Sequence, residues 1–364
     1  KLIWLNAVGL GEVMALRGLI AELHRRDSEL NFLVTSSTRT SSETFATNLP
    51  PKTIHQFLPL DIKSYAIRFL NHWRPDLVLW SEQDIWPGLI YQVAREGIPQ
   101  ALINARMNGK SFRKKAIVRP LFRATYKKFS LISAQDSKTA SMLASLGAQQ
   151  NVRIDGSLKP HCPPLFVDLD AQEALANKII GKKVWLAASC HSEDEDVALE
   201  AHRMLLINDP SYILILAPRN PIRTPYILTK LSGLNVKVRS RGELPNGKTQ
   251  IYLADTFSEM GLWYANSGSA LIGGTFSAVE GHNPWEALQL GCRIMHGPRY
   301  KNFLADFKIL EHAGACATVH SPEDIVEILT SRTTHRLENY EKLRREQSYD
   351  LTKLISNLLR LMVD

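Results

Sequence analysis

Short apolar runs alternate with amphipathic stretches along the first part of the chain. The runs have the length of buried strands and lie at residues 2–8, 31–35, 77–80, 100–104 and 131–134. The stretches between them repeat apolar residues at helical spacing, at residues 11–26, 62–73, 86–96 and 137–146. Strands that alternate with amphipathic helices predict a doubly wound sheet, because parallel neighbours need a helix-length crossover.

A proline-rich interval, KPHCPPLFVD at residues 159–168, interrupts this alternation, which then starts again. Strand-like runs follow at residues 184–189, 213–217, 236–238, 251–254, 270–273 and 293–296. Helical spacing follows at residues 193–208, 225–231, 257–265, 284–290, 302–312, 322–331 and 338–362.

This organisation predicts an α/β protein with two Rossmann-like domains, at residues 1–158 and 181–335. We expect a linker over residues 159–180, and a C-terminal helix within 336–364 that packs back on the first domain. Two such doubly wound domains facing a central cleft would bind ligands at the carboxyl ends of their strands.

Composition and charge narrow the class of protein. A chain of 364 residues exceeds what one hydrophobic core usually holds, which agrees with two domains. The formal net charge of +8 favours an anionic partner, such as a nucleotide, a phosphorylated lipid, a membrane surface or a nucleic acid. The four cysteines form no CxxC pair, which disfavours a disulfide framework or a zinc site. No apolar run approaches the ~20 residues of a membrane span.

The first motif with candidate chemistry is NAVGLGEVMALRGLI at residues 6–20, where a strand ends, two glycines turn the chain and a helix begins. It lacks the full GxGxxG spacing, which argues against a dinucleotide site. Glu12 falls in the first helical turn, where a carboxylate is placed to deprotonate a sugar hydroxyl. The alternative is an acid that stabilises the helix dipole without touching substrate.

A second polar loop lies in WSEQDIWPGLI at residues 80–90, again between a strand and a helix. Glu82 and Asp84 fall in this loop, and we expect them to order an acceptor or to support Glu12. Asp84 is also placed to be the N-cap of the helix that follows, and for this residue capping is the favoured role.

A basic stretch over residues 106–128 holds nine Lys or Arg and no acid. Apolar and aromatic residues are interleaved with the cations, which is typical of a membrane-surface or phosphate-binding face. Each cation near an anionic leaflet contributes roughly 1 kcal/mol. A solvated helix face is the ordinary alternative, and no nucleic-acid recognition motif is found. The candidates for contact with the acceptor or the membrane are Arg106, Arg113, Lys114 and Lys115.

Motifs of the second domain suggest a phosphate site. ASCHSEDE at residues 188–195 follows a strand, and the helix start offers backbone N–H groups to a phosphate. His191 is a candidate contact, although a lone histidine is more often structural. Arg219 comes just after a buried strand, where it can pair with a phosphate or a carboxylate.

The densest motif is LIGGTFSAVEGHNPWEALQLG at residues 271–291. A strand runs into Gly273 and Gly274, and a second glycine turn leads to a helix start. These can cradle a phosphate through backbone N–H groups. Glu286, in the first turn, can accept hydrogen bonds from a ribose diol.

In chain order, AVGLGEVMALRGLI, EQDIWP, INARMNGKS, GSLKP, ASCHSEDE, PRNPIR, ADTFSEMGLWY and GGTFSAVEGHNPWEAL resemble the motifs of the Kdo transferases of Gram-negative bacteria. The resemblance covers nearly the whole chain. Those inverting glycosyltransferases move 3-deoxy-D-manno-octulosonic acid (Kdo) from CMP-Kdo onto a lipid A precursor in lipopolysaccharide biosynthesis. The resemblance implies a GT-B fold, a glutamate base at Glu12, and no metal or cofactor.

The resemblance also implies a donor site and an acceptor site with departures. The family's CMP-binding positions fall on Arg219, Gly274, Thr275, Ser277, His282, Asn283 and Glu286. The family's Gly-Asn-Leu-Lys falls on residues 156–159, so Lys159 is carried over and Ser157 departs. Asn6 stands where the family usually has His, and Gly9–Leu10 where it usually has Ser-Val. These departures leave the acceptor and the number of sugars open.

The expected partners are CMP-Kdo, the lipid A precursor lipid IVA and the inner-leaflet surface, without nucleic acid. Because the family usually begins with an apolar anchor, we expect the cytoplasmic face of the inner membrane, with the protein peripheral or anchored by a segment outside this chain. Two alternatives stay open on sequence. One is a GT-B enzyme with another nucleotide sugar or acceptor, or an epimerase. The other is a non-catalytic protein that binds anionic lipid and does not need Glu12.

Overall fold

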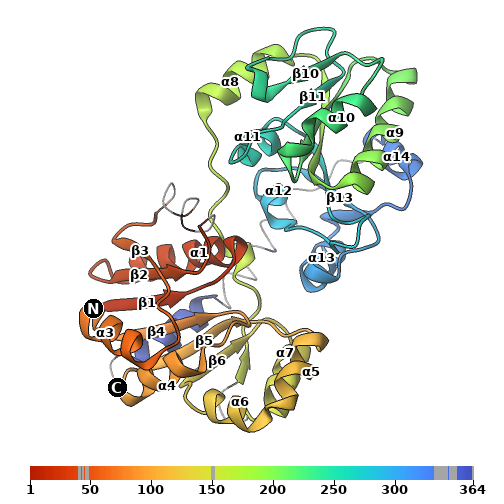
Figure 1. Ribbon diagram of the computed structural model, residues 1–364. Helices are drawn as coiled ribbons and strands as arrows, with labels where there is room; N and C mark the ends of the chain where they lie inside the picture. The colour runs from red at the N-terminus through yellow and green to blue at the C-terminus, as the bar shows by residue number, and fades with distance from the viewer. Residues whose placement is uncertain are drawn as a thin grey trace. The chain divides into compact units, whose positions relative to one another are not determined.

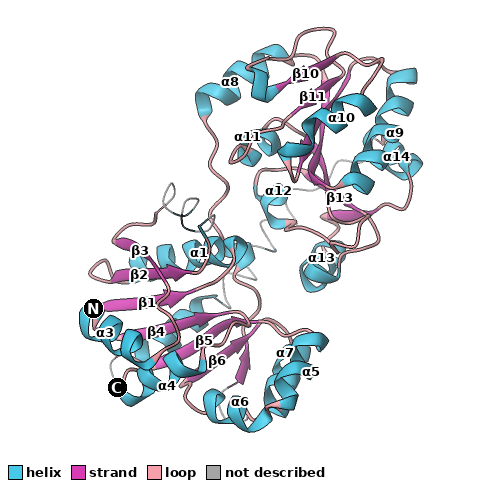
Figure 2. Ribbon diagram, viewed as in Figure 1, coloured by secondary structure: helices cyan, strands magenta, loops and turns pink. Residues whose placement is uncertain are grey.

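The computed structural model describes residues 1–39, 42, 45, 49–148, 152–331, 343 and 351–362. It divides into two compact units, residues 1–163 with 344–364 and residues 164–343 (Figure 1). In each unit, helices lie on both faces of a parallel sheet (Figure 2).

The sheet of the first unit has seven strands among the described residues, in the order β3-β2-β1-β4-β5-β6-β7. The strands are β1 (Leu2–Asn6), β2 (Asn31–Ser36), β3 (Thr53–Phe57), β4 (Leu77–Ser81), β5 (Gln100–Ala105), β6 (Leu131–Ala134) and β7 (Val152–Ile154). The helices are α1 (Leu10–Arg26), α3 (Lys63–Trp73), α4 (Pro87–Arg95), α5 (Gly109–Ile117), α6 (Arg119–Tyr126), α7 (Ser137–Ser145) and the short η1 (Lys159–His161). Since the order of the strands reverses between β1 and β4, the loops after these two strands border the switch point where ligands of such sheets bind.

The two faces of this sheet have separate cores. On one face, Ile3 and Leu5 of β1 pack with α1 and with Leu354 and Leu358 of the helical residues 351–360. On the other face, Trp4 packs with apolar residues of α3 and α4. The C-terminal residues therefore belong to the core of the first unit. Residues 338–342 and 344–350 of the predicted C-terminal helix lie outside the described residues.

The second unit repeats the architecture, with seven strands in the order β10-β11-β9-β8-β12-β13-β14 among the described residues. The strands are β8 (Lys183–Cys190), β9 (Tyr212–Pro218), β10 (Val236–Val238), β11 (Ile251–Leu253), β12 (Ser269–Ile272), β13 (Arg293–His296) and β14 (Cys316–Thr318). The α-helices are α8 (Leu169–Lys178), α9 (Ser192–Asn208), α10 (Thr224–Lys230), α11 (Met260–Ala265), α12 (Trp285–Gln289), α13 (Leu304–His312) and α14 (Pro322–Thr330). Short 3₁₀ turns are η2 (Pro221–Arg223), η3 (Arg239–Arg241) and η4 (Lys301–Phe303). Here the switch point lies between β8 and β12.

The predicted fold class, two Rossmann-like parallel-sheet domains, is confirmed by these sheets. The predicted linker over 159–180 was too long. The chain divides after Pro163, and α8 is a helix of the second unit whose Leu175 is buried in that unit's core. Its start at Asp168, which caps the helix by accepting from the Ala171 N–H at 3.1 Å, was hidden by the preceding prolines.

A close backbone contact fixes the connecting segment to each unit. In the first unit, a Cβ added to Gly18 of α1 would lie 1.9 Å from the carbonyl oxygen of His161. In the second unit, a Cβ added to Gly261 of α11 would lie 2.2 Å from the carbonyl oxygen of Phe166. Both positions therefore require glycine, because a backbone carbonyl cannot rotate away as a side chain can.

His202 of α9 is a fully buried neutral histidine. Trp185 Nε1 donates to its Nδ1 at 3.3 Å, so Nε2 carries the proton and donates to the Gln250 carbonyl at 2.8 Å. Burial lowers the pKa of His202 to about 4. The folded protein therefore takes up this proton only at a pH well below that at which the unfolded chain does.

Through His202, stability should consequently fall on acidification. Because the unfolded state binds the proton first, the unfolding free energy is expected to drop by about 2 kcal/mol between pH 7 and pH 5 through His202. The drop is measured as the difference between the wild-type protein and His202→Gln in urea unfolding at both pH values. His202→Gln, which cannot titrate, should remove that part of the pH dependence, and an unchanged slope would contradict the assignment.

Candidate functional site

Glu12 lies in the first turn of α1, at the carboxyl edge of the first sheet. Its Oε2 accepts hydrogen bonds from the backbone N–H groups of Val8 (3.0 Å) and Gly9 (3.3 Å). Burial, with the nearby charge of Glu82, raises the pKa of Glu12 to about 7, although the two hydrogen bonds oppose the rise. A half-buried carboxylate that titrates near neutrality is suited to act as a general base.

Glu82 lies beside this carboxylate, directly after β4, and is buried. It adopts a left-handed backbone, with φ of 62°, as does Asn104 at φ of 51°. Asn104 Nδ2 donates to Glu82 Oε1 at 3.4 Å, and its Oδ1 accepts from the Leu158 N–H at 3.1 Å. Glu82 and Asn104 are hydrogen-bonded to each other, and each holds a backbone conformation that costs a non-glycine residue free energy. The surrounding structure must therefore stabilise both residues. Asn104 lies in the INARMNGKS motif, but it was not predicted as a site residue; in the structure it donates to Glu82.

The predicted capping role of Asp84 is wrong. The N-terminus of α4 is capped from a distant part of the chain: Asp61 accepts from the N–H groups of Gly88 (3.2 Å) and Leu89 (2.5 Å). Asp84 instead contributes to the field at Glu12. Burial raises the pKa of Asp84, and the charge of Lys115 opposes the rise. The charges of Glu82 and Asp84 therefore both act on Glu12 at this edge.

The four cations predicted to meet acceptor or membrane are not equivalent. Arg113 and Lys114 are exposed on α5, and Arg106 is half-buried before it. Lys115 turns inward and donates to the Gln83 carbonyl at 2.8 Å. Lys115 is thus tied to the loop after β4 rather than to the outer surface.

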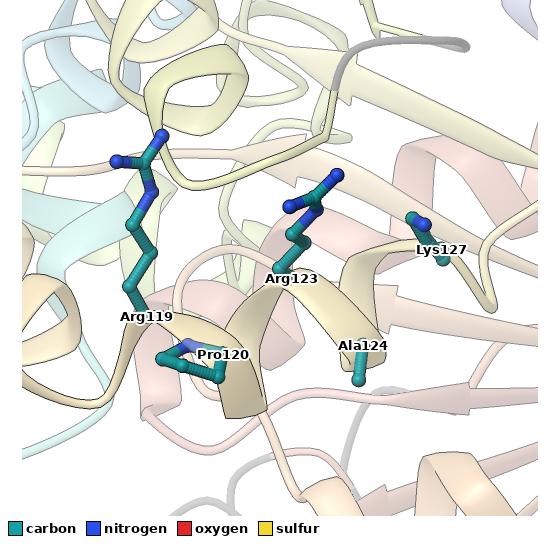
Figure 3. A pocket seen from close by; sticks show the side chains of 5 residues that line it. All are labelled: Arg119, Pro120, Arg123, Ala124 and Lys127. Atoms are coloured by element: carbon teal, nitrogen blue, oxygen red, sulfur yellow. The ribbon is translucent and has the colours of Figure 1, made fainter.

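The outer surface of the α5–α6 pair carries both charge and apolar groups. Arg119, Arg123 and Lys127 line one side of α6 and border a hollow of about 490 Å³ whose other lining residues are Pro120 and Ala124 (Figure 3). Ile117, which is 84% exposed, and Leu121 lie nearby in the chain. Like charges four residues apart repel by a few tenths of a kcal/mol, so an anion at this surface would relieve the repulsion.

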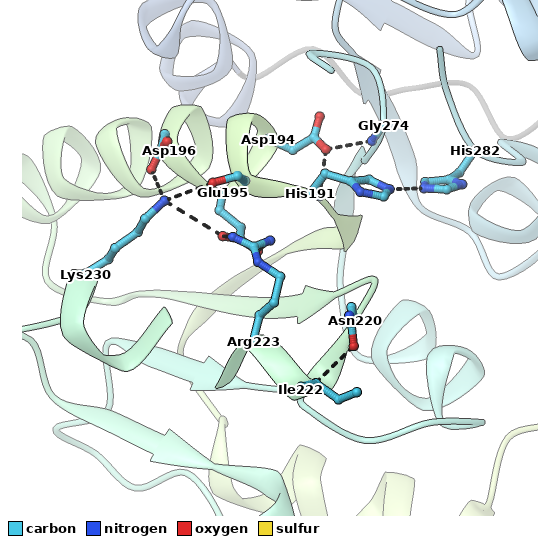
Figure 4. A network of polar contacts seen from close by, with 11 residues as sticks. His191, Asp194, Glu195, Asp196, Asn220, Ile222, Arg223, Lys230, Gly274 and His282 are labelled. Carbon is cyan, nitrogen blue, oxygen red and sulfur yellow. Dashed lines mark hydrogen bonds and ion pairs between the residues drawn. The ribbon is translucent and has the colours of Figure 1, made fainter. Parts of the chain in front are cut away.

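In the second unit, the loops after β8 and β12 meet at the switch point, and Asp194 is hydrogen-bonded to both of them (Figure 4). Asp194 is fully buried. Its Oδ2 accepts from the N–H groups of His191 (2.9 Å) and Gly274 (2.7 Å), and its Oδ1 from that of Phe276 (3.0 Å). The sequence motifs did not single out this residue, although an acid three positions into a helix is a capping signal.

This arrangement corrects the roles predicted for Gly274 and Thr275. The Gly274 N–H, expected to cradle a phosphate, is already donated to Asp194. Thr275 is fully buried; its hydroxyl donates to the Ile272 carbonyl at 2.6 Å and accepts from the Gly297 N–H at 2.8 Å. Both residues therefore shape the turn. A Cβ on Gly273 would lie 2.4 Å from the Ser189 carbonyl, so close approach of the two loops needs glycine there.

The polar side chains that remain at the turn are suited to recognise a nucleotide. The Nε2 atoms of His191 and His282 lie 3.0 Å apart, and the two rings are stacked. Burial, followed by the neighbouring His191 and Arg219, lowers the pKa of His282 to about 4, so this ring is neutral at pH 7. Arg219 is exposed at the end of β9 and supplies positive charge.

The predicted diol-binding residue, Glu286, is half-buried in α12. Asn283 Nδ2 donates to Glu286 Oε1 at 3.2 Å, and Asn283 Oδ1 accepts from the Trp285 N–H. Burial raises the pKa of Glu286, while Asn283 and Arg219 oppose the rise. Because α12 spans only Trp285–Gln289, its start is a weak source of the helix dipole that the sequence suggested.

Two further residues complete the predicted donor set. Ser277 is buried in the turn, and its Oγ accepts from the Val279 N–H at 3.3 Å. Lys159 is buried in η1 and belongs to the first unit, whereas the other predicted donor residues belong to the second.

Comparison with solved structures agrees with the two-domain fold. A UDP-GlcNAc 2-epimerase from Neisseria meningitidis, bound to UDP-GlcNAc, matches with a TM-score of 0.64 and 16% identity, over 99% of each chain. The glycotransferase of kitacinnamycin matches with a TM-score of 0.52 and 14% identity, over 99% of this chain and 98% of that one. At these identities the likeness shows the fold alone, which is of the GT-B type.

Sequence comparison identifies the family. Residues 1–162 match the family described as 3-deoxy-D-manno-octulosonic-acid transferase (kdotransferase). The 3-deoxy-D-manno-octulosonic acid transferase of Haemophilus influenzae is 30% identical, over 94% of this chain and 81% of that protein. The transferase of that name from Rickettsia bellii is 31% identical, over 94% and 82%. The chain therefore belongs to the Kdo transferase family and is a glycosyltransferase.

None of the described helices has both the length and the apolar character needed to cross a bilayer.

Proposed function

We propose that this protein transfers Kdo from CMP-Kdo to a lipid A precursor, with inversion at the anomeric carbon and Glu12 as the base. The observation that carries the proposal is a half-buried carboxylate at the switch point with a pKa of about 7, in a chain of this family. Glu12 takes the proton of an acceptor hydroxyl. The hydroxyl oxygen forms the bond to the anomeric carbon, while the bond from that carbon to phosphate breaks and CMP leaves.

The turn after β12 supports a role in holding the leaving nucleotide. Glu286 with Asn283 can accept from ribose hydroxyls, and Arg219, exposed at the end of β9, can pair with the phosphate. Fixed positive charge stabilises the charge that develops on CMP. We propose that Lys159 or Arg219 also meets the carboxylate of Kdo, and that no metal takes part.

Asp194→Asn should weaken donor binding, because an amide cannot accept three backbone hydrogen bonds as the carboxylate does. We expect the KM for CMP-Kdo to rise roughly tenfold and the unfolding free energy to fall by about 1–3 kcal/mol. Steady-state kinetics and urea unfolding measure the two effects. Asp196→Asn is the matched control, since Asp196 is exposed and pairs with Lys230 only at the surface; equal kinetics for both variants would contradict the role of Asp194.

The α5–α6 pair supports contact with an anionic membrane. Arg119, Arg123 and Lys127 face outward beside the exposed Ile117 and Leu121. Cations that flank exposed apolar groups favour the interfacial region of a bilayer. We propose that this surface places the enzyme on the inner leaflet, at the cytoplasmic face of the inner membrane, where the phosphates of the acceptor lie.

The test is incubation of the protein with CMP-Kdo, generated in situ, and lipid IVA, with the product identified by mass. Mass increments of Kdo, retained in EDTA, are expected, and their number reports how many sugars are added. UDP-sugars in place of CMP-Kdo are the donor control. Transfer from a UDP-sugar and none from CMP-Kdo would overturn the proposal.

A further inference from the structure

Lys115, one of the residues predicted to contact the acceptor or the membrane, points its ammonium group into the first unit. Its Nζ donates to the Gln83 carbonyl at 2.8 Å and lies 5.3 Å from the centre of the Phe122 ring. Burying an amine costs free energy unless the site compensates it. The compensation here comes from the loop after β4, which carries two carboxylates.

That loop bears directly on the base. Gln83 lies between Glu82 and Asp84, and both carboxylates raise the pKa of Glu12. Lys115 therefore reaches the segment that holds the two charges facing Glu12. Its own helix, α5, follows β5, the strand next to β4, so adjacent crossovers of the sheet bring the groups together.

We propose that Lys115 is a positioning residue for the transfer reaction: it ties the loop after β4 to α5, and its charge offsets the carboxylates around the base. This inference rests on the proposed role of Glu12.

The charges involved come from three elements. Glu12 is on α1, Glu82 and Asp84 are on the loop after β4, and Lys115 is on α5. Burial lowers the pKa of Lys115 to about 8, with Asp84 opposing the fall, so the ammonium form predominates at pH 7. The charge of Lys115 acts on Asp84, and the charge of Asp84 raises the pKa of Glu12. While Asp84 stays ionised, loss of the cation should therefore let Glu12 hold its proton to a higher pH.

The experiment is the pH dependence of kcat, with CMP-Kdo and lipid IVA, for the full chain. In Lys115→Met, we expect the midpoint of the acid limb to rise by about half a unit or more, as loss of a nearby opposite charge requires. At pH 7, kcat should fall about twofold or more, and the deficit should shrink as the pH rises towards 9, because Glu12 is then ionised in both proteins. If Lys115 had only a structural role, the loss of kcat would be the same at every pH and would not shrink at alkaline pH.

Two further variants complete the test. Lys115→Arg keeps the positive charge and should keep the wild-type acid limb. If the Met variant fails to fold, the Arg variant still tests whether the positive charge sets that limb. Lys138→Met removes an exposed lysine of α7 and should leave the profile unchanged. A Lys115→Met profile that coincides with that of Lys138→Met, or a deficit equal at every pH, would overturn the inference. Absence of any Kdo transfer by the wild-type protein would instead overturn the proposed function.

Discussion

Replacement of Glu12 by Gln is expected to lower kcat by about 10³-fold, because the amide cannot accept the proton of the acceptor hydroxyl. The side chains have nearly the same shape, and the amide oxygen can still accept from the Val8 and Gly9 N–H groups. Donor affinity should therefore change little. Single-turnover transfer from CMP-Kdo, with donor binding measured separately, tests this split; wild-type turnover in the variant would exclude Glu12 as the base.

The same substitution should stabilise the fold. The pKa of Glu12 is raised in the folded protein, from 4.5 to about 7, so its ionised form is disfavoured by folding. The cost is absent below pH 4.5, grows between pH 4.5 and 7, and is fully present above pH 7, where it amounts to about 3 kcal/mol. Glu12→Gln should therefore raise the unfolding free energy at pH 8 and change it little at pH 4.

Urea unfolding of the wild-type protein and the Gln variant at the two pH values measures the difference. A variant that is inactive but no more stable at pH 8 than the wild type would show that folding does not disfavour the ionised form of Glu12. Gain of stability with loss of turnover is the mark of a group kept for chemistry.

Gly18→Ala is expected to destabilise the protein by about 3 kcal/mol or more, although alanine normally stabilises a helix by about 1 kcal/mol relative to glycine. The added Cβ would lie 1.9 Å from the carbonyl oxygen of His161 and 2.6 Å from its carbonyl carbon. Both atoms belong to the backbone, so relief requires α1 and η1 to separate. The resulting loss of buried contact is the source of the cost.

Gly11→Ala is the matched control for this prediction. Gly11 lies in the same helix, and a Cβ there would meet nothing within 4 Å. It should be neutral or stabilising in thermal and urea unfolding. Equal stability of the two alanine variants would contradict the close approach of α1 to η1.

Most of the strands that the sequence predicted are buried on both faces, such as β4 and β9, where the apolar runs are continuous. The partly buried edge strand β10 was predicted as well. The edge strand β3, TIHQF, escaped because it is largely exposed and polar. The basic stretch was recognised by its charge but not resolved into α5 and α6, since neither helix has a deeply apolar face to set a period. In each case the element is stabilised by strand pairing or by packing against distant residues, which the local composition does not reveal.

Prediction of the site residues was limited in the same way, to signals that lie close together in the sequence. Glu12 and Glu82 were singled out because each follows a predicted strand just before or within a helix start, which is a local signal, and the base role of Glu12 came from the family resemblance. The cap of α4 by Asp61 and the bonds of Asp194 to the turn after β12 join residues far apart in the chain. No local pattern announces such partners, so Asp84 received a capping role, and Gly274 a phosphate-binding role, that other residues exclude.

The two glycine contacts leave little slack where the polypeptide passes from one unit to the other through Cys162–Leu165. Gly18 abuts the carbonyl of His161, and Gly261 abuts that of Phe166. Between these points stand Pro163 and Pro164, whose rings hold φ near −65°. Held by a close backbone contact at each end and restricted in φ at two adjoining prolines, this four-residue segment has few freely rotating backbone torsions of its own.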